Sequence, residues 1–343
     1  MSTTIDQTVA TPQAPLESEP RRSTGGLSRY LEPYALVLVL IACVVFFSLW
    51  PKTSATFPTA ANLQILLGSQ AVIAIIALGA LIPLIANQWD LSIGATAGVS
   101  SIFSAATMSA HLPLPVAIVV GVLIGATVGL VNALVVTQFR VNGVITTLGM
   151  ATILAGVINQ KTGGVSVTAD IPDVIVAFGS SNWFGIPRVA FALVFVALGA
   201  VYLLDHTPMG RYLYAIGSNP DAARLVGIRT KLIIGSAFVA ASSLAAVAGI
   251  LQVARQAGAD PRVGEGFTLP ALAAAFLSAA SIRPGRYNVG GTLVAIFFLA
   301  TVNNGLSLAG LPAYVSSYVN GAALIVGVGL AAFLGRKRQG KTG

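Results

Sequence analysis

Charged residues are scarce in this chain. Asp, Glu, Lys and Arg make up 9% of its 343 residues, whereas soluble domains carry about 25%. Hydrophobic residues make up 55%, and the mean hydropathy is +0.85. This composition excludes a soluble domain of useful size and indicates a polytopic membrane protein. The net charge of +8 is explained by the positive-inside rule and anionic lipid, so we expect no nucleic-acid partner.

Cysteine is nearly absent, and metal ligands are few. Cys43 is the single cysteine, which excludes a disulfide within the chain. It lies in an apolar run, and we interpret it as a packing residue. The two histidines, His111 and His206, lie at predicted span ends, and neither belongs to a cluster of potential metal ligands. We therefore expect no metal site.

The apolar runs also lack carboxylates, which ion-coupled carriers usually place at membrane depth. Asp90, in the segment NQWDLSIG at 87–94, is the carboxylate that comes closest to such a position. We favour a structural role for it as the N-cap of the following helix, with a place near a translocation path as the alternative. The chain has no HExxH, CxxC, nucleophile elbow or paired carboxylates, so we expect a protein that is not an enzyme.

A nucleotide site is not expected either. Residues 335–342 (GRKRQGKT) match the Walker A pattern in form. That loop needs a strand before it and a helix after it, but here an apolar run precedes it and only Gly343 follows. We interpret the segment as a basic anchor beside the membrane and expect no cofactor in this chain.

Long apolar runs dominate what is present. A helix needs about 20 residues to cross a bilayer, or fewer if protein surrounds it. Ten runs qualify: 34–50, 63–86, 92–110, 114–138, 143–160, 188–205, 232–253, 267–281, 288–306 and 313–334. The sequence therefore predicts an all-α polytopic membrane protein with about ten transmembrane helices. We expect a disordered cytoplasmic tail at 1–33, a membrane domain at 34–334 and a basic cytoplasmic tail at 335–343.

The distribution of Lys and Arg predicts the orientation. Arg21-Arg22 is followed by Ser, Thr and Gly instead of apolar residues, so we expect no cleaved twin-arginine signal and treat 34–50 as a retained span. With the N-terminus inside, 14 of the 19 Lys and Arg residues fall in inside segments; the other five are Lys52, Lys161, Arg188, Arg255 and Arg262. The positive-inside rule then places both termini in the cytoplasm. The longer outside loops are about 161–187 and 254–266.

Neutral amides within the spans are candidates for a translocation path. With Asp90 we select Asn132, Asn303 and Asn304, because amides bind hydroxyl groups without a full charge penalty. Hydrogen bonding between helices is the alternative for each. Asn132 and Asn303 lie in similar segments, GLVNAL at 129–134 and TVNNGL at 301–306. Their spans run in opposite directions, so an inverted repeat is possible, with chance similarity as the alternative.

Two local patterns predict helix contacts. Gly121, Gly125 and Gly129 recur every four residues, which favours close packing of one helix face.

The second pattern is a polar segment, 207–231, which we name the coupling loop and place in the cytoplasm. At its centre Asn219 is a predicted N-cap and Pro220 suits the first helical position.

The short helix that follows Asn219 has a two-sided surface. Asp221 suits the positive end of its dipole and Gly227 can end it, which leaves a helix core at 220–226. Ala222, Leu225 and Val226 fall on one side and Arg224 lies off it. A separately capped amphipathic helix of this kind is expected to dock on a partner.

Several motifs then resemble the permease subunits of bacterial ATP-binding-cassette importers for ribose, xylose and arabinose. The best match is GRYLYAIGSNPDAARLVGI at 210–228, which begins with Gly210 and Arg211. DLSIGA at 90–95, GLVNALVVTQFRVNGVITTLGM at 129–150, TGG at 162–164 and NNGL at 303–306 follow the family order. The resemblance covers about residues 60–330. The chain departs from the family pattern at QWDLS, where GIDLS is frequent, and at 278–286, where a glycine-rich loop is usual.

The resemblance implies a multi-pass permease of the bacterial plasma membrane. Its expected partners are an ATPase subunit that contacts the coupling loop and binds ATP, an extracytoplasmic sugar-binding protein, and a second permease copy. Alternatives within the importer class are permeases for branched-chain amino acids or nucleosides. Outside that class we retain an ion-coupled secondary carrier and a passive channel.

Overall fold

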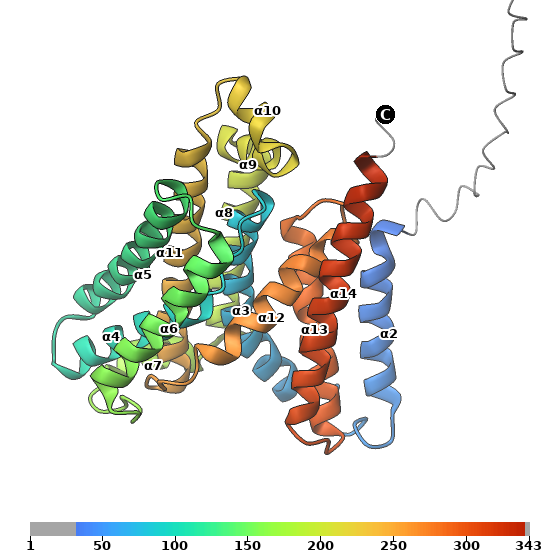
Figure 1. Cartoon of the computed structure of the whole chain (residues 1–343). Coiled ribbons are helices and arrows are strands. Elements are labelled where there is room, and N and C mark those ends of the chain that lie inside the picture. The colour runs from blue at the N-terminus through green and yellow to red at the C-terminus, as the bar shows by residue number, and fades with distance from the viewer. Residues whose placement is uncertain (1–31, 340–343) are drawn as a thin grey trace, which may run out of the picture.

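The computed structural model describes residues 32–339 and is almost entirely helical (Figure 1). Its helices are η1 Glu32–Tyr34, α2 Ala35–Leu49, α3 Ala60–Ile85, α4 Ile93–Ser109, α5 Leu114–Thr137, α6 Gly143–Thr162, α7 Asp173–Ser180, α8 Arg188–Val201, η2 Tyr202–His206, α9 Pro208–Ser218, α10 Pro220–Leu225, α11 Thr230–Gln256, α12 Glu265–Leu277, η3 Ser278–Ala280, α13 Val289–Leu308 and α14 Tyr314–Gln339. The all-α prediction is confirmed. The expected tail at 1–33 lies outside the described residues except for its last two positions.

Each of the ten predicted spans coincides with a helix. Seven helices within 32–339 are long and apolar enough to cross a membrane: α3, α5, α6, α8 with η2, α11, α13 and α14. The helices α2, α4 and α12 are shorter, so a total of about ten spans stays a prediction. α14 runs to Gln339, five residues beyond the predicted end of its span. The Walker-like segment is therefore helical up to that residue, where a phosphate-binding loop would be needed.

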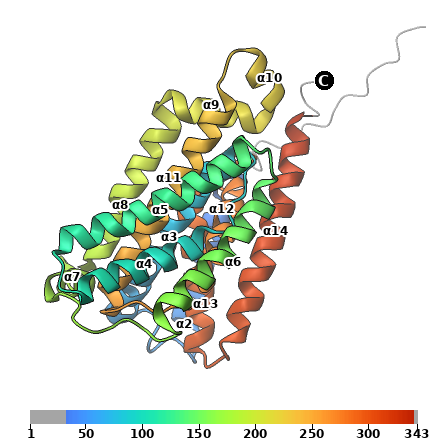
Figure 2. The ribbon, with the colours of Figure 1, turned by 60° about the vertical axis from the view of Figure 1, so that its left-hand side comes forward.

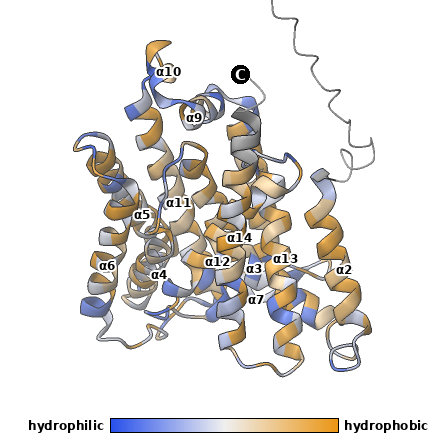
Figure 3. Ribbon diagram, turned by 45° about the vertical axis from the view of Figure 1, so that its right-hand side comes forward, coloured by the Kyte–Doolittle hydropathy of each residue, from blue (hydrophilic) through white to orange (hydrophobic). Residues whose placement is uncertain are grey.

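The centre of the bundle is α3, which α11, α12, α13 and α8 surround. From Ala71 to Ile85 nearly every side chain of α3 is buried. The outer helices α2 and α14 instead carry large apolar residues on their exposed surface, and Figure 3 colours much of α2 as hydrophobic. An apolar exterior around an apolar core fits a protein whose solvent is lipid.

α5 and α11 pack closely through the predicted glycine face. Gly121, Gly125 and Gly129 are all buried. A Cβ atom added at Gly125 would lie 2.5 Å from Ala246 Cβ, and one at Gly129 would lie 2.7 Å from Phe238 O. Only glycine permits this approach of the two backbones, so the prediction of close packing is confirmed.

Two short helices meet in the interior. α12 has 13 residues, a length of about 20 Å, and its first turn lies against the start of α4. A Cβ atom added at Gly264 would lie 2.6 Å from Gly94 O. α12 begins only at Glu265. The space between α4 and α6, toward the end of the molecule opposite α10, is therefore not filled by a helix.

The predicted outside loop 161–187 contains ordered structure that the sequence did not indicate. It holds α7 and a short antiparallel hairpin of β1 (Asn182–Trp183) and β2 (Ile186–Pro187). α7 packs on α11 and buries Ile175. Ala254 also leaves no room for a side chain at Gly179, since an added Cβ would overlap its carbonyl.

The start of α2 and the end of α14 lie at the same end of the bundle as α10 (Figure 1). The Ile282 N–H, in the connection before α13, donates to Pro33 O at 2.8 Å. Arg283 in the same connection donates to Asp205 at 2.7 Å. This end, hereafter the α10 end, therefore gathers elements from the beginning, middle and end of the chain.

Candidate functional site

The caps of α10 are formed as predicted. Asn219 Oδ1 accepts hydrogen bonds from the N–H groups of Asp221 and Ala222, at 3.1 and 2.9 Å. Pro220 is the first helical residue, where its missing N–H costs nothing. Gly227 has φ +85°, a left-handed conformation that suits the residue after a helix. Val226 is the C-cap and not part of the helix, so the predicted core at 220–226 is one residue too long.

α10 turns an apolar surface away from the protein. Ala223 is 4% exposed and fixes the helix on its own chain, whereas Leu225 is 88% and Val226 77% exposed. Ala222 is exposed beside them. Arg224 forms an exposed ion pair with Asp221 at 3.7 Å. Two large apolar side chains are thus exposed in an otherwise polar segment.

Gly210 and Arg211 lie on a second helix, α9, which was not predicted separately. A Cβ atom at Gly210 would lie 2.6 Å from Leu204 Cα in η2, so glycine allows α9 to fold back against the end of α8. Arg211 is exposed. Pro208 at the first helical position was the sequence signal for this helix. α9 and α10 together stand above the bundle, as Figure 2 shows.

A basic groove of about 930 Å³ opens beside α10. Four cations line it: Arg140, Arg224, Arg229 and Lys231. No Asp or Glu is among its lining residues within the described part of the chain. The Lys231 ammonium donates to Gln138 Oε1 at 3.2 Å, which ties the coupling loop to the end of α5. The groove gives the α10 end a positive surface next to its apolar one.

A second cavity of about 720 Å³ lies between α9, α14 and the connection before α13. Its aromatic wall includes Trp89 and Phe276, whose ring centroids are 4.8 Å apart. The Tyr214 hydroxyl donates to Tyr287 O at 2.7 Å. The Arg286 guanidinium lies 3.5 Å from the Tyr214 ring centroid. Burial raises the pKa of Tyr287 to about 12, so this phenol stays neutral at physiological pH.

The connection at 278–286, which departs from the family pattern, is held by hydrogen bonds from the side chain of Asn288. Asn288 Nδ2 donates to the carbonyl oxygens of Ser278, Ser281 and Arg286 at 2.9–3.0 Å. The hydrogen bond to Asp205 raises the pKa of Arg283, so this arginine keeps its charge at all physiological pH values. The basic residues that distinguish this connection therefore have structural partners.

Asp90 and Asn132 meet in one buried network. Asn132 Nδ2 donates to Ser92 Oγ at 2.9 Å, and Ser92 Oγ donates to Asp90 Oδ1 at 2.6 Å. The predicted cap role of Asp90 is corrected, because α4 begins at Ile93 and its N-cap is Ser92. Asp90 accepts from the Ser92 N–H at 2.9 Å and so shapes the turn before that helix. All three residues are fully buried, which favours a structural role for both Asp90 and Asn132.

Asn303 and Asn304 lie far along the bundle from that network, in the last turns of α13. Asn304 and Asn62 exchange two amide hydrogen bonds, each 3.0 Å. Asn303 donates to Asn320 Oδ1 at 3.0 Å. These bonds join α13 to α3 and α14, as expected of polar contacts between membrane helices. The four path candidates thus form two separate structural clusters and no common site, and their path role stays untested.

Sequence reasoning did not select a polar pocket of about 560 Å³ between α4, α6 and the start of α12. We name it the α6–α12 pocket. Its polar lining residues are Thr152, Asn159, Arg262, Glu265 and Thr268. Asn159 was noticeable in the sequence as an amide inside an apolar run, but nothing there indicated that it would face the beginning of α12.

The comparisons with known proteins agree with the motifs. Residues 62–328 match the family described as the permease component of the branched-chain amino acid transport system. The chain is 33% identical over 292 residues to the ribose import permease protein RbsC of Escherichia coli K12, covering 84% of this chain and 91% of that protein. The Haemophilus influenzae ribose import permease is 30% identical over 301 residues, 87% of this chain and 93% of that protein.

A third relative carries a different name. The autoinducer 2 import system permease protein LsrC of Photorhabdus luminescens is 29% identical over 290 residues, 84% of this chain and 87% of that protein. No solved structure matched the chain. The matched family is one of transport proteins and not of enzymes. The chain therefore belongs to the permease family that its motifs indicated: it is a multi-pass inner-membrane permease of an ATP-binding-cassette importer.

Proposed function

We propose that this permease imports a monosaccharide of the ribose type, driven by ATP hydrolysis in a partner subunit. The similarity to two ribose import permeases over most of the chain supports the solute class. The observation that carries the coupling role is the exposed pair Leu225 and Val226 on a separately capped helix. Autoinducer 2 is the second candidate solute, because a relative named for its import is almost as similar.

In this proposal the α10 end faces the cytoplasm and the ATPase subunit covers it. Leu225 and Val226 enter an apolar groove of the ATPase, and the cations of the basic groove meet acidic residues at the rim. A second copy of the chain completes the permease. A sugar-binding protein delivers the solute at the opposite end, and ATP binding and hydrolysis switch the path between outward and inward access through α10.

Uptake in cells tests the solute and the energy source. Cells that express the chain with its importer partners take up radiolabelled ribose, and cells that lack the chain do not. Depletion of ATP stops the uptake, whereas an ionophore that collapses ion gradients leaves it intact while ATP is maintained. Uptake of leucine or adenosine without ribose contradicts the solute class. Uptake that stops with the ionophore and survives ATP depletion assigns the chain to ion-coupled carriers.

The substitution Leu225→Asp tests the docking surface. It places a carboxylate in the apolar contact, and loss of a central anchor costs about 2 kcal/mol or more in such interfaces. We expect the amount of ATPase that co-purifies with the permease to fall at least about tenfold and uptake to stop. Membrane insertion is unchanged, because Leu225 has almost no contact with its own chain.

The matched control is Leu225→Met, which keeps an apolar side chain of similar size and retains both ATPase and uptake. If Leu225→Asp retains as much ATPase as this control, the assignment of the docking surface is wrong.

A further inference from the structure

The α6–α12 pocket brings together several polar side chains that have no partner within the described part of the protein. Within residues 32–339, the side chains of Asn159, Arg262, Glu265 and Thr268 have neither a hydrogen bond nor an ion pair with the protein. Thr152 is bonded only to Leu148 O of its own helix, at 3.1 Å. The amides of Asn132, Asn303 and Asn304 are, by contrast, engaged in bonds between helices.

The pocket exists because α12 is short. Its wall on one side is α6 from the middle of that helix, at Thr152, to its last turn, at Asn159. On the other side lie the segment before α12 and its first turn, with Glu265 and Thr268. The close approach of Gly94 and Gly264 forms its inner limit. A full-length span in place of α12 would fill this space with apolar side chains.

The polar groups suit a neutral solute with many hydroxyls. One cation, Arg262, and one anion, Glu265, leave the lining without net charge. The Asn159 amide both donates and accepts, Glu265 accepts from hydroxyls, and Arg262 donates to them. The volume of about 560 Å³ falls within the range of small-molecule sites, about 300–1,000 Å³. An apolar or anionic solute would leave several of these groups unmatched.

The pocket also opens to the outside of the single chain. Its walls come from α4, α6 and the start of α12, and Figure 2 shows α6 at the front of the molecule with α12 behind it. Asn159, Arg262 and Glu265 are exposed on the single chain. A solute that arrives at the end opposite α10 therefore meets these groups before it meets the buried Asp90–Ser92–Asn132 network.

We propose that the α6–α12 pocket is the first part of the translocation path and binds the hydroxyl groups of the incoming solute through Asn159, Glu265 and Thr268. The identity of the solute as a sugar rests on the proposed function. The position of the path does not, because it follows from the free polar groups and the gap that α12 leaves.

Cysteine labelling tests the position of the path. Cys43 is the single cysteine of the chain, so a Cys43→Ser background gives one thiol per variant. Thr152→Cys and Asn159→Cys are compared with Ile153→Cys, a neighbour on α6 that is exposed but does not line the pocket. The reagent is a membrane-impermeant methanethiosulfonate added outside cells that contain the whole importer. Such reagents attack thiolates, which form in water and not in lipid.

We expect the two pocket cysteines to react at least about tenfold faster than the control, and the attached group to stop uptake of radiolabelled ribose. Pocket cysteines that react as slowly as Ile153→Cys overturn the proposal, because the pocket is then closed to water. Fast labelling with uptake unchanged also overturns it, because the solute then passes elsewhere.

Glu265→Gln gives a readout without chemical modification. It keeps the shape of the side chain and an acceptor oxygen but removes the charge, so we expect a raised KM for uptake, an unchanged amount of protein in the membrane and unchanged ATPase co-purification. An unchanged KM contradicts a contact with the solute. If the unmodified chain imports leucine and no ribose, the proposed function is wrong. The position of the path is still tested in that case, because labelling of the pocket cysteines shows whether the imported solute passes through the pocket.

Discussion

At the scale of single residues, the buried network of Asp90, Ser92 and Asn132 decides how α4 starts. Asp90 Oδ1 accepts from both the N–H and the hydroxyl of Ser92, and Asn132 on α5 binds the same hydroxyl. The second carboxylate oxygen, Asp90 Oδ2, has no hydrogen-bond partner among the described residues. The hydrogen bonds stabilise the turn, whereas a buried charge opposes folding.

Substitution of Asp90 separates these two effects. Asp90→Asn keeps the acceptor oxygen and removes the charge, so we expect a thermal unfolding midpoint in detergent equal to or above that of the wild type. Asp90→Ala leaves the Ser92 N–H and hydroxyl without their partner, and we expect a loss of about 1–3 kcal/mol. Uptake remains in Asp90→Asn if the role is structural. A stable Asp90→Asn protein without uptake would instead place this carboxylate in the translocation path.

At the scale of elements, the shape of α10 depends on its caps, and the packing of α5 on α11 depends on glycine. α10 has only six residues, so its shape depends on Asn219 and Gly227 at its ends as much as on its interior. α5 and α11 depend on the glycine face to bring their backbones together. In a membrane this close contact replaces the hydrophobic effect as the source of helix association.

The substitution Gly125→Val tests the α5–α11 contact. Its side chain would meet Ala246 Cβ and Ser242 O, at 2.5 and 2.6 Å from the added Cβ, so the helices must separate. We expect a loss of about 1–3 kcal/mol, seen as a lower thermal unfolding midpoint. Gly199→Val on α8 is the control, because no atom lies within 4 Å of its added Cβ. Equal midpoints for the two variants would contradict the role of the glycine face.

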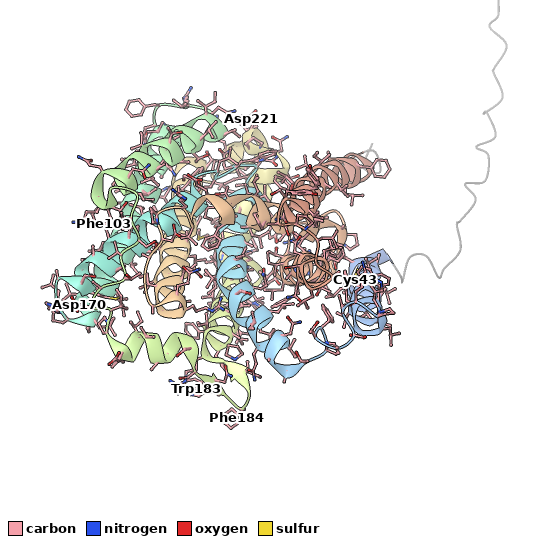
Figure 4. The ribbon with its side chains drawn as sticks, turned by 90° about the horizontal axis from the view of Figure 1, so that it is seen from below. Cys43, Phe103, Asp170, Trp183, Phe184 and Asp221 are labelled. Carbon is pink, nitrogen blue, oxygen red and sulfur yellow. The ribbon has the colours of Figure 1, made fainter. Side chains whose placement is uncertain are left out.

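At the scale of the whole molecule, the two ends of the bundle differ in character. The α10 end carries the basic groove, the aromatic cavity and the apolar surface of α10. The opposite end carries α7 and the β1–β2 hairpin, from which Phe184, 99% exposed, projects away from the bundle (Figure 4). This polarity is what an importer needs if energy enters at one end and solute at the other.

Labelling from either side of the membrane tests the orientation. In the Cys43→Ser background, we expect Phe184→Cys to react with an impermeant thiol reagent added outside intact cells. Asp221→Cys, at the other end, reacts only after the cells are permeabilised, because the positive-inside rule places the α10 end in the cytoplasm. Both variants change exposed residues, so folding is preserved. Reaction of Asp221→Cys in intact cells would reverse the proposed orientation.

The sequence alone determined the features that depend on local or average properties. Ten apolar runs predicted the positions of ten helices, because helix in lipid must satisfy its own backbone hydrogen bonds. Asn219, Pro220 and Gly227 predicted α10 because caps act within a few residues of each other. Gly121, Gly125 and Gly129 predicted close packing from their spacing, although not that α11 would be the partner.

Only the tertiary structure decided which polar groups are already paired. Asn132, Asn303 and Asn304 were chosen as path candidates because amides can bind hydroxyl groups without a full charge penalty, but each binds a partner that is distant in the sequence. Asn159 and Glu265 looked no more significant in the sequence, yet they remain free in a common pocket. Hydrogen bonds between helices depend on contacts formed across the whole bundle, and no pattern of neighbouring residues encodes them.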